Sequence, residues 1–245
     1  MSEQNDKPSL LPLVLVPGSL CDQRLFAPQI NHFSKQRPVY VADVTQSNSI
    51  SYLASDVLGT IKGAFALAGL SMGGIIAMEV MRQAPERVDR LALLNTSFGS
   101  EPSEKQNIRQ QQMDLVNRDG MTGLISLVED YYFPKYLAKN CAYAADIKRT
   151  VIDMANDAGI EVFNKQWEAL LHRIDSTESL QRVDVPTLIL CGEEDVLCKP
   201  KIHQKMAELI QESHLEILPD CGHLSTLEKP DMVNRSLQFW LQRIK

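Results

Sequence analysis

The sequence predicts an α/β protein with a mostly parallel sheet of six or seven strands, flanked by helices and interrupted by a helical insertion. Short apolar runs alternate with longer segments of helical periodicity up to about residue 97. Residues 98–183 carry helical patterns without a convincing strand, and the alternation returns after Pro186. Such alternation is typical of a parallel sheet covered by helices. We therefore expect one core domain, residues 1–97 and 184–245, with residues 98–183 inserted into it.

The expected strands are short apolar runs bounded by glycine, proline or polar residues. They are residues 13–16, 39–42, 64–68, 91–94, 187–191 and 215–218. Because parallel strands end at the same edge of a sheet, the loops that follow them are expected to build the functional site.

The expected helices follow apolar positions at helical spacing. In the core they are residues 23–33, 50–61, 72–83, 201–210 and 232–244. In the insertion they are residues 104–118, 121–130, 141–156 and 159–173, with breaks at Pro102, Gly120, Pro134 and Gly159. Glycine and proline disfavour helix interiors, which is why the breaks are placed there.

Composition excludes several classes of function. The 245 residues carry a net charge of −6 without a basic stripe, so no nucleic-acid partner is expected. No apolar stretch approaches the length of a membrane span, and the apolar run at residues 10–16 lacks a cationic leader, so a cytoplasmic protein without membrane contact is expected. The five cysteines have scattered spacing, which predicts free thiols and no metal site.

Ser71 stands in the most informative motif of the chain, Gly69-Leu70-Ser71-Met72-Gly73, which Gly74 follows. An apolar run precedes the motif and a helical pattern follows it. G-x-S-x-G between a strand and a helix is the signature of a nucleophile elbow, a sharp turn that exposes a reactive serine hydroxyl. Glycines are needed there because strand and helix cross closely.

A serine nucleophile needs a base within hydrogen-bond reach and a carboxylate that orients the base. Asp195 follows the expected strand 187–191, and His223 follows the expected strand 215–218. The chain order Ser71, Asp195, His223 is the order of an elbow-type triad. We therefore predict these three residues as catalytic.

Other acids and histidines are weaker candidates. Glu193, Glu194 and Asp220 are alternative carboxylates, but Asp195 lies furthest along its loop. The remaining histidines lie in helical patterns or before a strand, where surface positions are expected: His32, His172, His203 and His214.

The oxyanion of an acyl-transfer reaction requires two backbone N–H groups. Met72, directly after the serine and at a helix start, is expected to supply one. The loop after strand 13–16 is expected to supply the other, from Ser19 or, failing that, from Leu20.

Three segments together resemble the α/β-hydrolase fold superfamily over nearly the whole chain: Gly69–Gly74, Cys191–Asp195 and Cys221–Leu224. The resemblance implies that residues 98–183 form a cap over the site and that no cofactor or metal is needed. The chain departs from many members by carrying Pro17-Gly18 where they have His-Gly in the oxyanion loop.

These features predict a serine hydrolase that cleaves small carboxylic esters or thioesters through an acyl-enzyme on Ser71. Related proteins use similar triads as C–C bond hydrolases, lyases or cofactor-free perhydrolases, and a non-catalytic ligand-binding protein is a further alternative. The expected partner is a small ester or thioester with an apolar portion. Arg109, Arg118 and Arg173 in the insertion are either solvated or salt-bridged helix residues, or groups that bind a substrate carboxylate.

Overall fold

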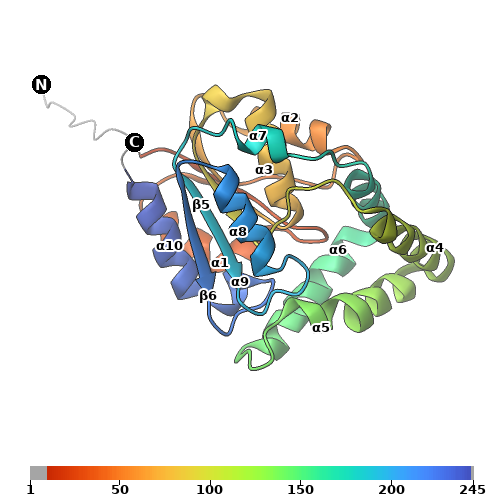
Figure 1. The fold of residues 1–245 in the computed structure, drawn as a ribbon. Helices are drawn as coiled ribbons and strands as arrows, with labels where there is room; N and C mark the ends of the chain where they lie inside the picture. Colours follow the sequence, from red (N-terminus) through yellow and green to blue (C-terminus); the bar gives the residue numbers. More distant parts are fainter. Residues whose placement is uncertain (1–9, 244–245) are drawn as a thin grey trace, which may run out of the picture.

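The computed structural model describes residues 10–243 and contains a six-stranded parallel sheet in the order β2-β1-β3-β4-β5-β6 (Figure 1). The strands are β1 (Leu13–Val16), β2 (Val39–Val41), β3 (Phe65–Leu70), β4 (Val88–Leu94), β5 (Thr187–Gly192) and β6 (Ser213–Leu218). All six expected strands are confirmed, although β3, β4, β5 and β6 extend beyond the expected runs and β2 ends one residue earlier. The parallel sheet with helices on both faces agrees with the fold class expected from the sequence.

Alternate residues of the central strands pack on opposite faces of the sheet. Leu13 and Leu15 of β1 belong to one buried apolar cluster, whereas Val14 and Val16 belong to another. Side chains of a strand alternate sides, so a run that is apolar at every position must be covered on both faces. Helices on both faces provide that cover.

One face is covered by α2 (Ile50–Thr60), α3 (Met72–Gln83) and α8 (Pro200–Leu209). The other is covered by α1 (Ala27–Phe33) and α10 (Pro230–Gln242), which contact each other. Three short elements complete the core: η1 (Gln23–Phe26), η2 (Pro85–Arg87) and α9 (Ser225–Glu228). Among the helices of residues 10–243, none is both long and apolar enough to cross a membrane.

Helices of residues 98–183 form a lobe beside the sheet (Figure 1). They are α4 (Ser103–Ser126), the π-helical turn η3 (Leu127–Tyr132), α5 (Phe133–Tyr136) and α6 (Ala144–Leu171). The short helix α7 (Thr177–Leu180) instead packs on the core against α3 and α8. Within α4 and α6 the expected breaks are confirmed, because Gly120 (φ 64°) and Gly159 (φ 75°) have non-helical backbone angles and each divides its element into two helices that meet at a kink. Glycine readily adopts positive φ, which permits the kink.

Candidate active site

Ser71 lies in the sharp turn between β3 and α3, with φ 57° and ψ −118°. A Cβ on Gly69 would lie 2.2 Å from the carbonyl oxygen of Gly73, and a Cβ on Gly73 would lie 1.9 Å from that of Val16. Both approaches are too close for any side chain. A Cβ on Gly74 would likewise lie 2.6 Å from the Thr96 side chain. The three glycines are thus required by the crossing of α3 over β1 and β3.

The three residues predicted as a triad form one hydrogen-bonded chain. The Nε2 atom of His223 lies 3.0 Å from the Ser71 hydroxyl oxygen, and its Nδ1 atom lies 2.9 Å from an Asp195 carboxylate oxygen. Asp195 follows β5 and His223 follows β6, so neighbouring strands bring the two together at the carboxyl edge of the sheet. Asp195 and His223 are 2% and 3% exposed.

Asp195 is held as a carboxylate by its surroundings. Its Oδ1 atom accepts hydrogen bonds from the N–H groups of Leu197 and Cys198, at 2.9 and 2.8 Å. Burial raises the pKa of Asp195, but the adjacent charge of His223 and hydrogen bonds from His223, Asn95 and Cys198 lower it more, so the pKa lies below its usual value. Of the alternative acids, Glu194 instead accepts the backbone N–H of Lys139.

Asn95 joins the hydrogen-bonded series of Ser71, His223 and Asp195, and the sequence analysis did not predict it. Its side-chain amide donates to Asp195 Oδ2 (2.9 Å) and to the Gly222 carbonyl (3.1 Å), while its own carbonyl accepts from Ser225 Oγ (2.5 Å). Asn95 directly follows β4 and has a φ of 45°. Asn95 lies at the carboxyl end of β4, and β4 neighbours β3, which precedes Ser71. That position could have identified Asn95 from the sequence.

The loop that carries His223 is fixed by contacts with residues of the helical segment. The His223 ring stacks on Tyr136, with ring centres 5.9 Å apart and planes 14° apart, and the His223 N–H donates to the Tyr136 carbonyl at 2.6 Å. The buried carboxylate of Glu228 accepts N–H groups from Ala138, Gly222 and Leu224 at 2.9 to 3.0 Å. Glu228 therefore joins the histidine loop to the segment after α5.

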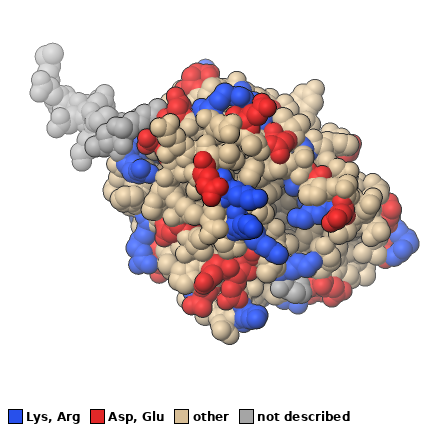
Figure 2. Space-filling model, viewed as in Figure 1, with Lys and Arg blue, Asp and Glu red and all other residues tan. Residues whose placement is uncertain are grey.

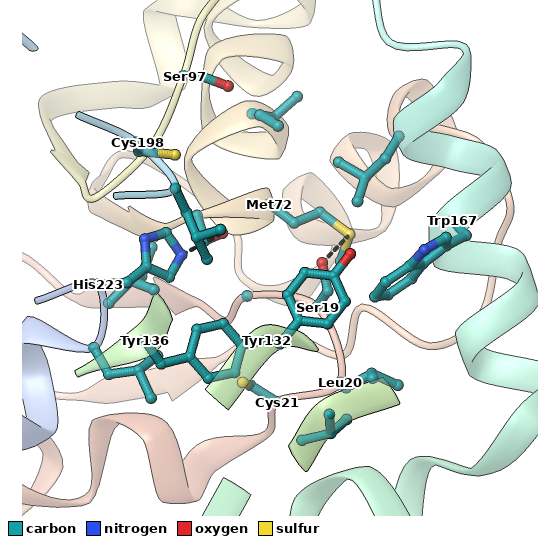
Figure 3. Close-up of a pocket in the computed structure, with 18 of the residues that line it drawn as sticks. Ser19, Leu20, Cys21, Met72, Ser97, Tyr132, Tyr136, Trp167, Cys198 and His223 are labelled. Atoms are coloured by element: carbon teal, nitrogen blue, oxygen red, sulfur yellow. Dashed lines mark hydrogen bonds between the residues drawn. The ribbon is translucent and has the colours of Figure 1, made fainter. Parts of the chain in front are cut away.

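The loop after β1 lies beside Ser71, as the predicted oxyanion site requires. Ser19 and Met72 both line the cavity at Ser71, and the Ser19 hydroxyl contacts the Met72 sulfur at 3.7 Å (Figure 3). The N–H of Leu20, the fallback donor, instead donates to the side chain of Gln166 at 2.8 Å. That bond engages the Leu20 N–H, so Ser19 stays the predicted donor of this loop.

The cavity above Ser71 has a volume of about 130 Å³. Core residues and the helical segment line it together. Figure 3 shows Tyr132 and Tyr136 among the lining side chains, with His223 and Trp167 on opposite sides of the drawn pocket. The lining from the helical segment also includes Glu101, Lys105, Arg109, Val128, Val151, Ala155, Leu170 and Arg173.

Asp195, Cys198 and His223 are the group of possible metal ligands found among the described residues, with ligand atoms within 4.8 Å of one another. Each Asp195 oxygen already accepts two hydrogen bonds. A cysteine binds metal as the thiolate, and burial raises the pKa of Cys198 far above its usual value, which opposes that form. The cluster thus suits proton transfer to and from Ser71 better than metal binding.

Comparison with known proteins identifies a family that the chain matches. Residues 38–230 match the family described as serine aminopeptidase, S33. A proline iminopeptidase of Lactobacillus helveticus is 28% identical, and the match spans 72% of this chain and 65% of the relative's own length. A carboxylesterase of Bacillus subtilis is 26% identical over 100% of this chain and 84% of its own.

The fold agrees with solved structures of the same kind. A thermophilic esterase from Thermogutta terrifontis superimposes with a TM-score of 0.85 and 25% identity, over 96% of this chain and 90% of its own. The match of the family to most of the chain, together with this likeness, shows that the chain belongs to the serine aminopeptidase S33 family of α/β-hydrolases.

Proposed function

We propose that the protein is a serine hydrolase that cleaves small carboxylic esters or thioesters, with Ser71, His223 and Asp195 as its catalytic triad. The observation that carries the proposal is the continuous hydrogen-bonded chain from Ser71 Oγ through His223 to Asp195, with distances of 3.0 and 2.9 Å. A buried carboxylate, a histidine and a serine in this order activate the hydroxyl for attack.

In the proposed reaction, Ser71 Oγ attacks the ester carbonyl while His223 Nε2 takes the hydroxyl proton. The N–H groups of Met72 and Ser19 stabilise the oxyanion of the tetrahedral intermediate, and the start of α3 adds its positive dipole end. The intermediate collapses to an acyl-enzyme, and the leaving alcohol or thiol takes the proton from His223. Water, deprotonated by His223, then releases the acid and restores Ser71.

We infer that residues 98–183 act as a cap that closes the cavity over Ser71. Tyr132, Tyr136 and Trp167 from this segment line the cavity and supply its apolar wall. Exclusion of water by such a wall strengthens the electrostatic stabilisation of the oxyanion. The apolar wall also favours substrates with an apolar portion.

Covalent labelling tests the proposal. A fluorophosphonate probe is expected to label the wild type but not Ser71→Ala, and short p-nitrophenyl esters are expected to be hydrolysed by the wild type with a rate lowered at least about 10³-fold in Ser71→Ala. Ester turnover that survives in folded Ser71→Ala would contradict the assignment. Labelling without ester turnover would redirect the search to thioesters, to C–C bonds and to proline p-nitroanilide, the type of substrate that the name of the Lactobacillus relatives suggests.

A further inference from the structure

The cavity contains more positive than negative charge. Lys105, Arg109 and Arg173 line it, and Glu101 is the acid among its lining residues. Arg173 has an almost buried side chain (7% exposed) and Arg109 a largely buried one (18%), whereas Lys105 is exposed and therefore lies at the mouth. Lys and Arg side chains also gather on the surface from α8 toward the helical lobe (Figure 2).

Glu101 pairs with both arginines through the same oxygen. Arg109 Nε donates to Glu101 Oε2 at 3.0 Å, and Arg173 donates to the same atom with its Nη1 group while its Nε donates to the Gly99 carbonyl. One carboxylate neutralises one guanidinium, so the two arginines and Lys105 leave a surplus of about two positive charges in the cavity at neutral pH. A guanidinium has five N–H donors, most of which these bonds leave unused.

The surplus has a cost in free energy, because charges removed from water need partners of opposite sign. The side chain of Glu101 is 1% exposed, and its Oε1 atom is buried without a hydrogen-bond partner among the described residues. Glu101 lines the same cavity, but its Oε2 atom already accepts hydrogen bonds from both arginines, so the net charge of the lining stays positive. A ligand that carries negative charge matches this arrangement and a cationic ligand does not.

Arg109 also has a position that suits ligand binding. Its guanidinium lies 5.5 Å from the centre of the Trp167 ring, and Trp167 lies across the drawn pocket from His223 (Figure 3). Stacking on an aromatic ring holds the guanidinium plane in place and so lowers the entropy lost on binding an anion. The reactive serine and the arginines are thus distinct parts of one cavity.

We propose that the substrate is an ester or thioester that carries a free carboxylate on the portion remote from the scissile bond, and that Arg109 and Arg173 bind this carboxylate while Lys105 attracts it at the mouth. The proposal rests on the proposed hydrolase function and names its substrate class. Arginine is suited to this role because its planar fork binds both oxygens of a carboxylate.

Three esters of similar size test the charge preference: monoethyl glutarate (anionic), the ethyl ester of glutaramic acid (neutral, nearly isosteric) and ethyl 4-(trimethylammonio)butanoate (cationic). Hydrolysis is followed by proton release in a pH-stat. The wild type is expected to prefer the anionic over the neutral ester by about 10-fold or more in kcat/KM, with the cationic ester slowest. In Arg109→Gln this ratio is expected to fall about 10-fold, and Arg109→Lys is expected to recover part of it.

Arg118→Gln is the matched control, because Arg118 lies on the same helix, has a 70% exposed side chain, pairs with Asp119 and does not line the cavity. Its ratio is expected to equal that of the wild type. Arg173→Gln leaves the buried Glu101 carboxylate with Arg109 as its remaining ion-pair partner, which lowers stability. The unfolding of this variant is therefore measured before its kinetics are compared with those of the wild type. An equal rate for the anionic and neutral esters, or a ratio unaffected by Arg109→Gln, overturns the carboxylate site while leaving the hydrolase intact.

Binding to the Ser71→Ala variant separates the two proposals. Calorimetry is expected to show that this variant binds monoethyl glutarate more tightly than the neutral ester, and that adding Arg109→Gln removes the difference. If no ester is hydrolysed by the wild type but this binding difference is present, the carboxylate site stands and the reaction is wrong. If Ser71→Ala binds the two esters equally, the carboxylate site is wrong whatever the reaction.

Discussion

At the scale of single residues, the site depends on positions where a side chain would not fit. Gly69 and Gly73 allow the backbones of β3, α3 and β1 to approach one another, and both would place a Cβ against a backbone carbonyl. Backbone atoms of a central sheet cannot move aside as a flexible side chain can. The glycines of the motif are therefore required by backbone packing, whereas its serine is the proposed nucleophile.

Gly73→Ala is expected to lower the free energy of unfolding by about 3 kcal/mol or more and to abolish labelling of Ser71, since its Cβ would lie 1.9 Å from the Val16 carbonyl oxygen. Urea unfolding at neutral pH measures the change. Gly59→Ala is the control, because Gly59 lies on α2 with no atom within 4 Å of the added Cβ, and a helical Gly→Ala change stabilises by up to about 1 kcal/mol. Similar effects of the two substitutions would contradict the steric explanation.

At the scale of elements, His223, the proposed catalytic histidine, is positioned by groups outside the strand that precedes it. Glu228 on α9 accepts N–H groups on either side of His223, from Gly222 and Leu224, and a third from Ala138 after α5. The Tyr136 ring stacks on that of His223. Residues 98–183 thus help to position the proposed triad as well as line the cavity.

Glu228→Gln is expected to lower kcat for a p-nitrophenyl ester on the order of 10-fold, because the amide replaces an acceptor by a donor that faces backbone N–H groups. KM is expected to change little, since Glu228 does not line the cavity. Stopped assays on protein shown to be folded by circular dichroism separate the two constants. Glu208→Gln, at an exposed position on α8, is the control. An unchanged kcat in Glu228→Gln would show that the loop is held without the carboxylate.

At the scale of the whole molecule, a buried histidine couples stability to pH. The sequence predicted a surface position for His203, but the structure buries it completely against the sheet. Its Nε2 atom accepts the N–H of Thr96 at 3.0 Å, a bond that requires the neutral ring, and burial lowers the pKa of His203 to about 4.

The free energy of unfolding is expected to fall as the pH drops from about 6.5 to about 4. In this range the unfolded chain binds a proton at His203 that the folded protein does not, and the loss approaches the order of 3 kcal/mol. Urea unfolding at pH 7.5 and pH 5 is expected to show a smaller pH effect in His203→Gln, whose amide oxygen can still accept the Thr96 N–H. His172→Gln, at an exposed position, is expected to keep the wild-type pH effect. Equal pH effects in all three proteins would exclude His203 as the source.

The sequence predicted the six strands, their mostly parallel arrangement and the candidate triad, whereas the order of the strands came from the structure. The predicted features follow from local signals: apolar runs of strand length, glycines where backbones must touch, and loops that start at strand ends. Ser71 directly follows β3, and Asp195 and His223 lie in the loops after β5 and β6, so their meeting at one edge follows from the topology.

The tertiary structure alone decided which side chains support the site. The bond of Glu228 to Ala138 and the pairing of Glu101 with Arg173 join segments far apart in the chain, for which neither helical nor strand periodicity carries a signal. Periodicity reports which face of an element is buried, but the partner that a buried polar group finds depends on how the elements pack. The sequence offered Arg109, Arg118 and Arg173 as possible carboxylate-binding groups, and only the structure showed that Arg109 and Arg173 line the cavity whereas Arg118 does not. The proposed substrate preference rests on that packing.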